Sequence, residues 1–274
     1  MDRAGRLSAV SAKSKGFAQG RHGARGALTA IIGCLTLDSR FYRWVRALAK
    51  APSIFAVLSG DLVASSRMSG ADLDEARRIM RATVKALPGT SAGGVVGKPE
   101  FFRGDAWQLL LDAPGPALRL ALLLRADLRW QAGADTRIAI GIGPARSIDR
   151  RRVSLSSGEA FELSGHALDA MTGFFALTAA LPARVVPAAQ WLPVLAHLCS
   201  ELIQGWTPRQ AEIVAHALQH RDATHEDIGA MLARPVRKQT VTSALRSAHF
   251  RALSEVLELF EDTDWARLMH GPDD

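Results

Sequence analysis

The chain has 274 residues, 48% of them hydrophobic and 22% charged, which excludes a disordered or fibrous protein and allows two globular domains. Its net charge of +7 comes from residues 1–50, which hold ten Lys/Arg and two Asp; the rest of the chain is at −1, so the overall charge is no argument for nucleic-acid binding. The longest apolar stretches, 27–37 and 170–183, are shorter than the about 20 residues of a membrane-spanning helix.

Residues 1–50 form a basic extension rich in Arg, Lys, Gly, Ala and Ser, which we expect to be disordered. Two other interpretations stay open. The segment resembles an amphipathic arm for a partner or membrane surface, because Phe41, Trp44 and Leu48 fall at helical spacing among basic residues. It also resembles a secretory signal, because basic residues precede an apolar run that ends at Cys34.

Residues 51–180 carry a pattern of strands and helices. Apolar β-forming runs predict the strands, and apolar positions at helical spacing predict the helices. Pro88 and Gly89 are expected to end the first helix, and Gly104 to lie at the turn of a hairpin. In chain order we expect a strand at 54–58, a helix at 71–87, a hairpin at 101–111, a helix at 116–130 and a strand at 137–142. Strand–helix–strand–strand–helix–strand is the ferredoxin-like order.

Two Gly-Asp pairs stand beside these strands, Gly60-Asp61 and Gly104-Asp105. A carboxylate next to a buried strand is costly to desolvate unless a cation meets it. If the two strands are neighbours, Asp61 and Asp105 come together and can bind a divalent metal. The alternative is that each Asp only stabilises a turn, since Gly-Asp is a common turn pair.

Three motifs resemble, in order and spacing, the catalytic domain of class III nucleotidyl cyclases: Ser59-Gly60-Asp61-Leu62-Val63, Gly104-Asp105-Ala106 and Arg137-Ile138-Ala139-Ile140-Gly141-Ile142-Gly143. Together with the carboxy-terminal region described below, the chain resembles the SatD-type bacterial proteins. The resemblance implies that Asp61, Asp105 and the carbonyl of Leu62 hold Mg²⁺ or Mn²⁺ ions. It also implies a nucleotide site made by Ser65 and Ser66, at the start of the next helix, with Arg103 and Gly104.

The chain departs from the cyclase pattern at the positions that catalysis requires. Phe101 stands in place of the purine-selecting Lys. The positions of the transition-state Asn and Arg become Asp169 and Gly173 in one register, and Glu162 and His166 in the other. Losing one preorganised charge of this kind costs about 10² to 10³ in rate, although Arg103 could replace the missing Arg. We therefore expect nucleotide binding without cyclisation; an active metal-dependent cyclase that uses Asp61 and Asp105 is the alternative.

The segment 156–169 is small, polar and Gly-containing. It is expected either to line the pocket or to form a helix that packs closely on a neighbour through Ser164 and Gly165. Residues 181–205 predict a Pro-containing linker followed by a helix at 194–204.

Residues 206–262 predict an all-α domain that resembles the winged or LuxR-like helix-turn-helix of bacterial regulators. Thr207-Pro208-Arg209-Gln210 has the residues of a capping box, and Thr224 is expected to cap the second helix. The third helix should turn Val241 and Leu245 inward. Its outer face is expected to contact double-stranded DNA and comprises Arg237, Lys238, Gln239, Thr240, Thr242, Ser243 and Arg246.

The expected whole is an α+β protein: a ferredoxin-like, cyclase-type domain at 51–180, then the helix-turn-helix at 206–262 and a tail at 263–274. Leu253, Val256, Leu257 and Phe260 suggest a helix that forms a homodimer. Two distant cysteines without metal-ligand spacing indicate a reducing, cytoplasmic location. The expected function is regulation through nucleotide and DNA binding. A purely structural interaction module is a further alternative.

Overall fold

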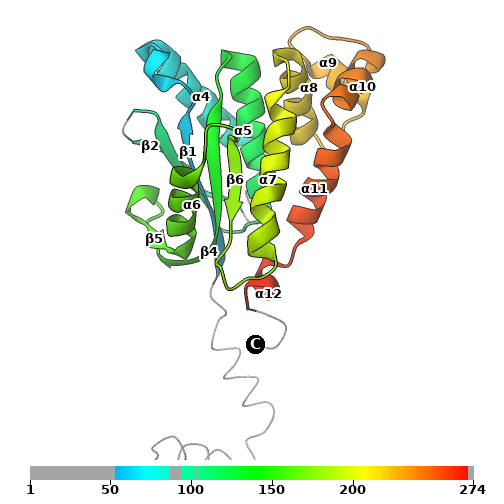
Figure 1. Cartoon of the computed structure of the whole chain (residues 1–274). Helices are drawn as coiled ribbons and strands as arrows, with labels where there is room; N and C mark the ends of the chain where they lie inside the picture. The colour runs from blue at the N-terminus through cyan, green and yellow to red at the C-terminus, as the bar shows by residue number, and fades with distance from the viewer. Residues whose placement is uncertain (1–52, 87–93, 103, 271–274) are drawn as a thin grey trace, which may run out of the picture. The chain divides into compact units, whose positions relative to one another are not determined.

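The computed structural model describes residues 53–86, 94–102 and 104–270, which form a mixed α+β structure (Figure 1). The predictions for residues 1–50, for Arg103 and for the last four residues lie outside the described residues. The strands are β1 (Ile54–Leu62), β2 (Val95–Phe102), β3 (Ala106–Leu111), β4 (Thr136–Ser147), β5 (Ser157–Gly158) and β6 (Leu177–Ala180). The α-helices are α4 (Gly70–Ala86), α5 (Ala117–Ala132), α6 (Glu159–Ala170), α7 (Ala188–Gln204), α8 (Pro208–Gln219), α9 (His225–Met231), α10 (Lys238–Ser247), α11 (Phe250–Asp262) and α12 (Trp265–His270). Two 3₁₀ turns, η1 (Ser65–Arg67) and η2 (Val153–Leu155), complete the set.

Strand β1 lies at the centre of the sheet, with the order β2-β3-β1-β4-β5. It pairs antiparallel with both β3 and β4, β2 pairs antiparallel with β3, and β6 runs parallel to β4. The predicted hairpin is confirmed: Phe101 lies opposite Trp107, and Gly104 at the turn has a φ of +87°, which glycine adopts readily. The sheet therefore places the carboxyl end of β1 beside the amino ends of β3 and β4.

The two faces of the sheet are covered by different helices. Alternate residues of a strand point to opposite faces, so Ala56 and Leu58 of β1 belong to the large core with α4 and α5. Val57 belongs to a smaller cluster with Ala160 of α6. Helix α6 lies directly on β4: a Cβ at Gly141 would be 2.2 Å from the carbonyl oxygen of Ala160 and 2.5 Å from the amide of Ser164. The predicted close packing at Ser164 is confirmed.

Gly165 does not take part in that packing, because nothing lies within 4 Å of the position of a Cβ there. Two other boundaries differ from expectation. Strand β1 continues through Gly60 to Leu62, because the absent side chain at Gly60 leaves room for the ring of Trp107 and the carbonyl of Arg137. Helix α7 begins at Ala188 instead of residue 194, with Pro193 inside it.

The carboxy-terminal helices pack onto the sheet region through α5. Helices α8 and α11 contact α5, α7 contacts β6, and the buried apolar residues form one continuous core from β1 to α12. Residues 51–274 accordingly cluster as one compact unit. The predicted tail contributes α12, whose Trp265 and Met269 are buried. Among the described residues, no helix is both long and apolar enough to cross a membrane.

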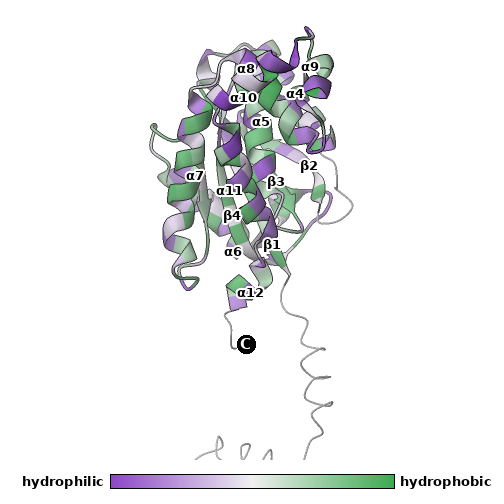
Figure 2. Cartoon of the chain, turned by 90° about the vertical axis from the view of Figure 1, so that its right-hand side faces the viewer, coloured by the Kyte–Doolittle hydropathy of each residue, from purple (hydrophilic) through white to green (hydrophobic). Residues whose placement is uncertain are grey.

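The predicted dimer surface on α11 is wrong. Leu253, Leu257 and Phe260 are at most 3% exposed, because they pack into the chain's own core. A second copy of the chain therefore cannot bind these three side chains. Leu259 of α11 is exposed, and further exposed apolar side chains lie on α7, at Trp191 and Leu198; Figure 2 shows hydrophobic colour along α7.

Candidate functional site

The strand register brings the two predicted metal-binding aspartates to one cavity. Asp61 lies opposite Ala106 in the β1–β3 pairing, directly beside the hairpin that carries Asp105. The amide of Leu62 donates a hydrogen bond to the carbonyl of Asp105, with 3.3 Å between nitrogen and oxygen. All three predicted metal ligands, Asp61, Leu62 and Asp105, line the same cavity of about 380 Å³. The three residues that the sequence analysis named therefore lie together at one cavity.

An arginine that the sequence analysis did not assign holds one of these carboxylates. Arg137 of β4 is the cross-strand partner of Asp61, and alternation puts both side chains on the α6 face. Its Nε lies 2.8 Å from Oδ1 of Asp61 and its Nη2 lies 2.5 Å from Oδ2, a bidentate ion pair. The hydrogen bonds that Arg137 donates to Asp61 raise the pKa of Arg137 above its ordinary value, with smaller contributions from the charges of Asp61, Asp105 and Asp169. The arginine is therefore held as a cation among three carboxylates.

The predicted nucleotide-binding residues lie around the hairpin. Ser65 donates a hydrogen bond from its hydroxyl to Oδ2 of Asp105, and Ser66 is exposed in the same 3₁₀ turn. The two serines do not begin the next helix as expected. Helix α4 begins at Gly70, where Ser69 and Asp72 hydrogen-bond each other across the first turn.

The inner wall of the cavity is built from a second ion pair. Arg125 of α5 is 0% exposed, and its Nε and Nη2 lie 2.9 and 2.7 Å from the carboxylate oxygens of Asp135. Arg129 adds a contact of 2.8 Å to the same carboxylate, and the amide of Thr136 adds another. Burial acts to raise the pKa of Asp135, but the hydrogen bonds and charges of both arginines outweigh it and lower the pKa below its ordinary value.

Sequence reasoning missed the roles of Arg125, Asp135 and Arg137. A signal was present for Arg125, which falls at a core position of an otherwise leucine-rich helix face. An arginine is almost never fully buried unless it is paired, so a buried acidic partner was to be expected. No comparable signal points to Arg137, because its partner lies 76 residues away in the sequence.

The residues around Asp61 have ligand types that Mg²⁺ and Mn²⁺ prefer: two carboxylates and a neighbouring carbonyl. In the present pairing these oxygens are not free for a metal ion, because both oxygens of Asp61 bind Arg137 and one oxygen of Asp105 accepts from Ser65. Within the described ranges, no three His, Cys, Asp or Glu side chains are grouped as metal ligands. A metal could bind here only after Arg137 has left Asp61.

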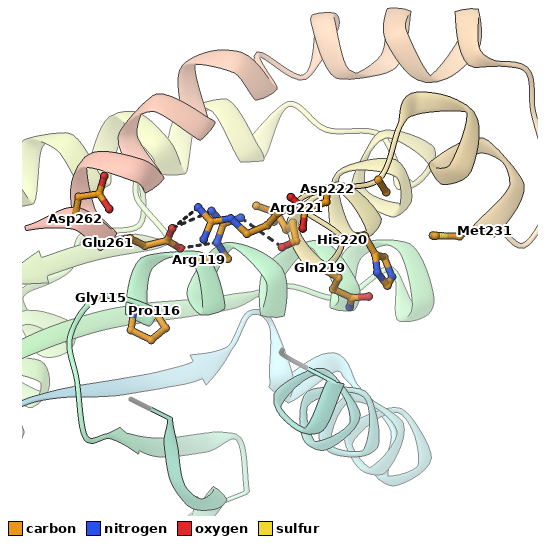
Figure 3. Close-up of a pocket in the computed structure, with 12 residues that line it drawn as sticks. Gly115, Pro116, Arg119, Gln219, His220, Arg221, Asp222, Met231, Glu261 and Asp262 are labelled. Carbon is orange, nitrogen blue, oxygen red and sulfur yellow. Dashed lines mark hydrogen bonds and ion pairs between the residues drawn. The ribbon is translucent and has the colours of Figure 1, made fainter. Parts of the chain in front are cut away.

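A larger cavity, of about 640 Å³, lies where the start of α5 meets the loop after α8 and the end of α11 (Figure 3). Arg119 and Arg221 converge there on the carboxylate of Glu261, at 2.6 and 2.8 Å. Arg119 is 8% exposed and also donates to the carbonyl of Leu218. Because these ion pairs link α5, the loop after α8 and α11, we regard this region as a junction between the sheet region and the carboxy-terminal helices.

Helices α8 and α9 have the caps that the sequence predicted, whereas Met231, expected to face inward at the end of α9, is exposed. Both capping boxes are present, at Thr207 with Gln210 and at Thr224 with Asp227. In α10, Val241 and Leu245 are buried. The predicted outer face is exposed at Arg237, Lys238, Gln239, Thr240, Ser243 and Arg246.

Thr242 differs from the rest of that face, since it is half-buried and its hydroxyl lies 2.8 Å from Nδ1 of His225. Arg237, Lys238 and Arg246 form no ion pair with any residue that the structure describes. Two cations of α10 and the arginine that precedes it are therefore available to an external anion.

Neither the models of known protein families nor the curated proteins compared with this chain match its sequence.

Proposed function

We propose that this protein is a regulator that binds a nucleotide together with a divalent metal at the Asp61–Asp105 cavity and binds DNA through α10. The single observation that carries the nucleotide site is the register of β1 with β3, which brings Asp61, Leu62 and Asp105 together. The strand order β2-β3-β1-β4, with α4 and α5 on one face, supports a ferredoxin-like, cyclase-type arrangement.

The chemistry of the cavity favours a phosphate-bearing ligand. Its volume of about 380 Å³ is within the range of small-molecule sites. Arg137 reaches its wall with 34% of its side chain exposed, and a guanidinium group matches the geometry of phosphate oxygens. Asp61 and Asp105 supply the carboxylates that a metal ion on that phosphate would need.

Cyclisation is not part of the proposal. Phe101, at the purine-selecting position, packs beneath the guanidinium groups of Arg77 and Arg81, at 5.8 and 5.0 Å from its ring centre. Asp169, at one transition-state position, adds negative charge near Arg137. Neither position offers a cation to a triphosphate, so the residues support binding more than catalysis.

Thermal unfolding with each nucleoside triphosphate, with and without Mg²⁺ or Mn²⁺, tests the site. A ligand at 100 times its Kd stabilises the folded state by about 2.7 kcal/mol, which raises Tm measurably. We expect a metal-dependent rise for the wild type and none for Asp105→Asn. Asp112→Asn is the matched control, because Asp112 is exposed and directly follows β3 at the strand's other end. An unchanged rise in Asp105→Asn contradicts the proposed site.

The DNA-binding part rests on the exposed cations of α10 and on its place at the outer side of α8 and α9. Helix α10 begins at Lys238 after an extended Arg237, so both basic residues lie at its amino-terminal end. An exposed helix that presents its first turn and polar face is the arrangement by which trihelical modules enter the major groove. The buried side chains of α10 are Val241 and Leu245, so the polar face does not take part in core packing.

Fluorescence anisotropy with random-sequence duplex DNA at several salt concentrations tests this part. Replacing Arg237 and Lys238 with Ala removes two phosphate contacts, so the salt slope should fall by about 2 and the affinity should drop. The control is Arg150→Ala/Arg151→Ala, an adjacent exposed basic pair beyond β4. If the α10 variant keeps the wild-type slope, α10 is not the DNA-binding surface.

A further inference from the structure

The position of Arg137 conflicts with metal binding at Asp61. Its guanidinium group uses both carboxylate oxygens of Asp61, and the remaining Nη1 lies 3.4 Å from the carbonyl of Met171. The same group faces the charges of Asp105 and Asp169. The cation that neutralises this acidic surface is thus part of the chain itself.

Arg137 can leave Asp61 only by moving. Asp61 raises the pKa of the arginine, so the group does not release the carboxylate by losing its proton at any ordinary pH. The pair is nevertheless partly solvated, with side-chain exposures of 34% for Arg137 and 21% for Asp61. Exchange of partners is therefore open to it, because the carboxylate and the guanidinium both reach solvent.

A free divalent ion and an anionic ligand affect this pair differently. A metal ion approaching alone must displace the arginine and is repelled by it at short range. A phosphate group offers the arginine a new bidentate partner at the moment when the metal takes the carboxylate. Exchange of both partners then leaves no unpaired charge in the cavity.

We propose that Arg137 is a built-in counter-ion that blocks divalent metal at Asp61 and Asp105 until a phosphate-bearing ligand draws it away. This inference rests on the proposed function and adds to it an order of binding. Metal alone binds weakly, and metal together with a polyphosphate binds strongly. Only the side chain of Arg137 needs to move. The backbone of β4 stays in place, because β4 pairs with β1 and α6 packs on its face.

Calorimetric titration with Mn²⁺ alone tests the block. Arg137→Gln should bind Mn²⁺ about tenfold or more tightly than the wild type, because the competing charge is gone. Arg137→Lys keeps the charge but loses the bidentate geometry, so its affinity for Mn²⁺ should lie between those of the wild type and Arg137→Gln. If the Gln variant fails to fold, the comparison of Arg137→Lys with the wild type tests the block. Asp61→Asn combined with Arg137→Gln should abolish the gain, which places the ion at this carboxylate.

The matched control is Arg184→Gln. Arg184 forms a bidentate pair with Glu159, at 2.6 and 2.7 Å, outside the residues that line the cavity. Removing it exposes a carboxylate elsewhere, and the affinity for Mn²⁺ at the cavity should stay at the wild-type value. A gain in this variant equal to that of Arg137→Gln overturns the inference.

A second titration uses the preformed complex of Mn²⁺ with inorganic triphosphate. The wild type should bind this complex about tenfold or more tightly than Mn²⁺ alone, and Arg137→Gln should lose most of that difference. If wild type and Arg137→Gln bind Mn²⁺ alone equally but both bind the complex, the block is refuted and the nucleotide site stands. If no variant binds either form, the proposed nucleotide site fails and the inference fails with it.

Discussion

Two arginine–aspartate pairs line the same cavity but have opposite surroundings. At the inner wall, Arg125 is fully buried, and a second arginine and a backbone amide also contact Asp135. At the outer wall, Arg137 is one-third exposed, and it faces other carboxylates besides Asp61. Both pairs are bidentate, so hydrogen-bond geometry does not distinguish them.

The difference lies in solvent access and in which charge is in excess. The inner wall has more cations than carboxylates, and the outer wall has more carboxylates than cations. Breaking a buried ion pair costs much stability, because it removes a partner from a desolvated charge. Breaking a partly solvated pair costs little, because water replaces the partner. One pair is therefore a fixed part of the fold, and the other can exchange its partner for a ligand.

The largest expected effect is the loss of Arg125. Arg125→Met should lower the free energy of unfolding by about 3 kcal/mol or more, because Asp135 loses two charge-assisted hydrogen bonds and keeps only Arg129 as a charged partner. The same substitution at the outer wall, Arg137→Met, should cost less than about 1 kcal/mol. Urea unfolding of the two variants measures both values. Equal losses would remove the distinction between the two walls.

A prediction of intermediate size tests whether the backbone of β4 stays fixed against α6, so that only side chains move at the outer wall. Gly141→Ala should destabilise the fold by about 1–3 kcal/mol, because the new Cβ meets the backbone of α6 at 2.2 and 2.5 Å. Gly165→Ala on the same helix meets nothing within 4 Å, and should be neutral or stabilising by up to about 1 kcal/mol. Chemical unfolding compares them. A neutral Gly141→Ala would show that β4 and α6 can separate.

The smallest expected effect is a pH dependence from the inner wall. The pKa of Asp135 is lowered in the folded protein, so its contribution to stability is present above its unfolded pKa of about 3.9. That contribution is lost as the pH falls through the lowered value. In unfolding measured from pH 7 to pH 2, Asp135→Asn should flatten the acid-side decline, and Arg129→Met should flatten it partly. An unaltered decline in Asp135→Asn would show that the inner pair does not set the acid stability.

Local patterns predicted most of the elements. The helical spacing of apolar residues located α4 and α5 within one or two residues at most, and Gly104 marked the hairpin turn. The capping boxes at Thr207 and Thr224 were readable because each uses residues within one turn of a helix. Where a prediction failed, as at Gly60 and Pro193, a residue typical of breaks lies inside a regular element supported by its neighbours.

By itself the sequence determined the order of β1, α4, the β2–β3 hairpin, α5 and β4, the position of Asp61 and Asp105 beside strands, and the exposed cations at α10. Only the tertiary structure decided that Arg137 neutralises Asp61, that Arg125 is buried against Asp135, and that α11 turns Leu253, Leu257 and Phe260 into the core. The physical reason is range. Turns, caps and helix faces depend on residues close in sequence, whereas the partner of a charge depends on strand register and helix packing between distant segments.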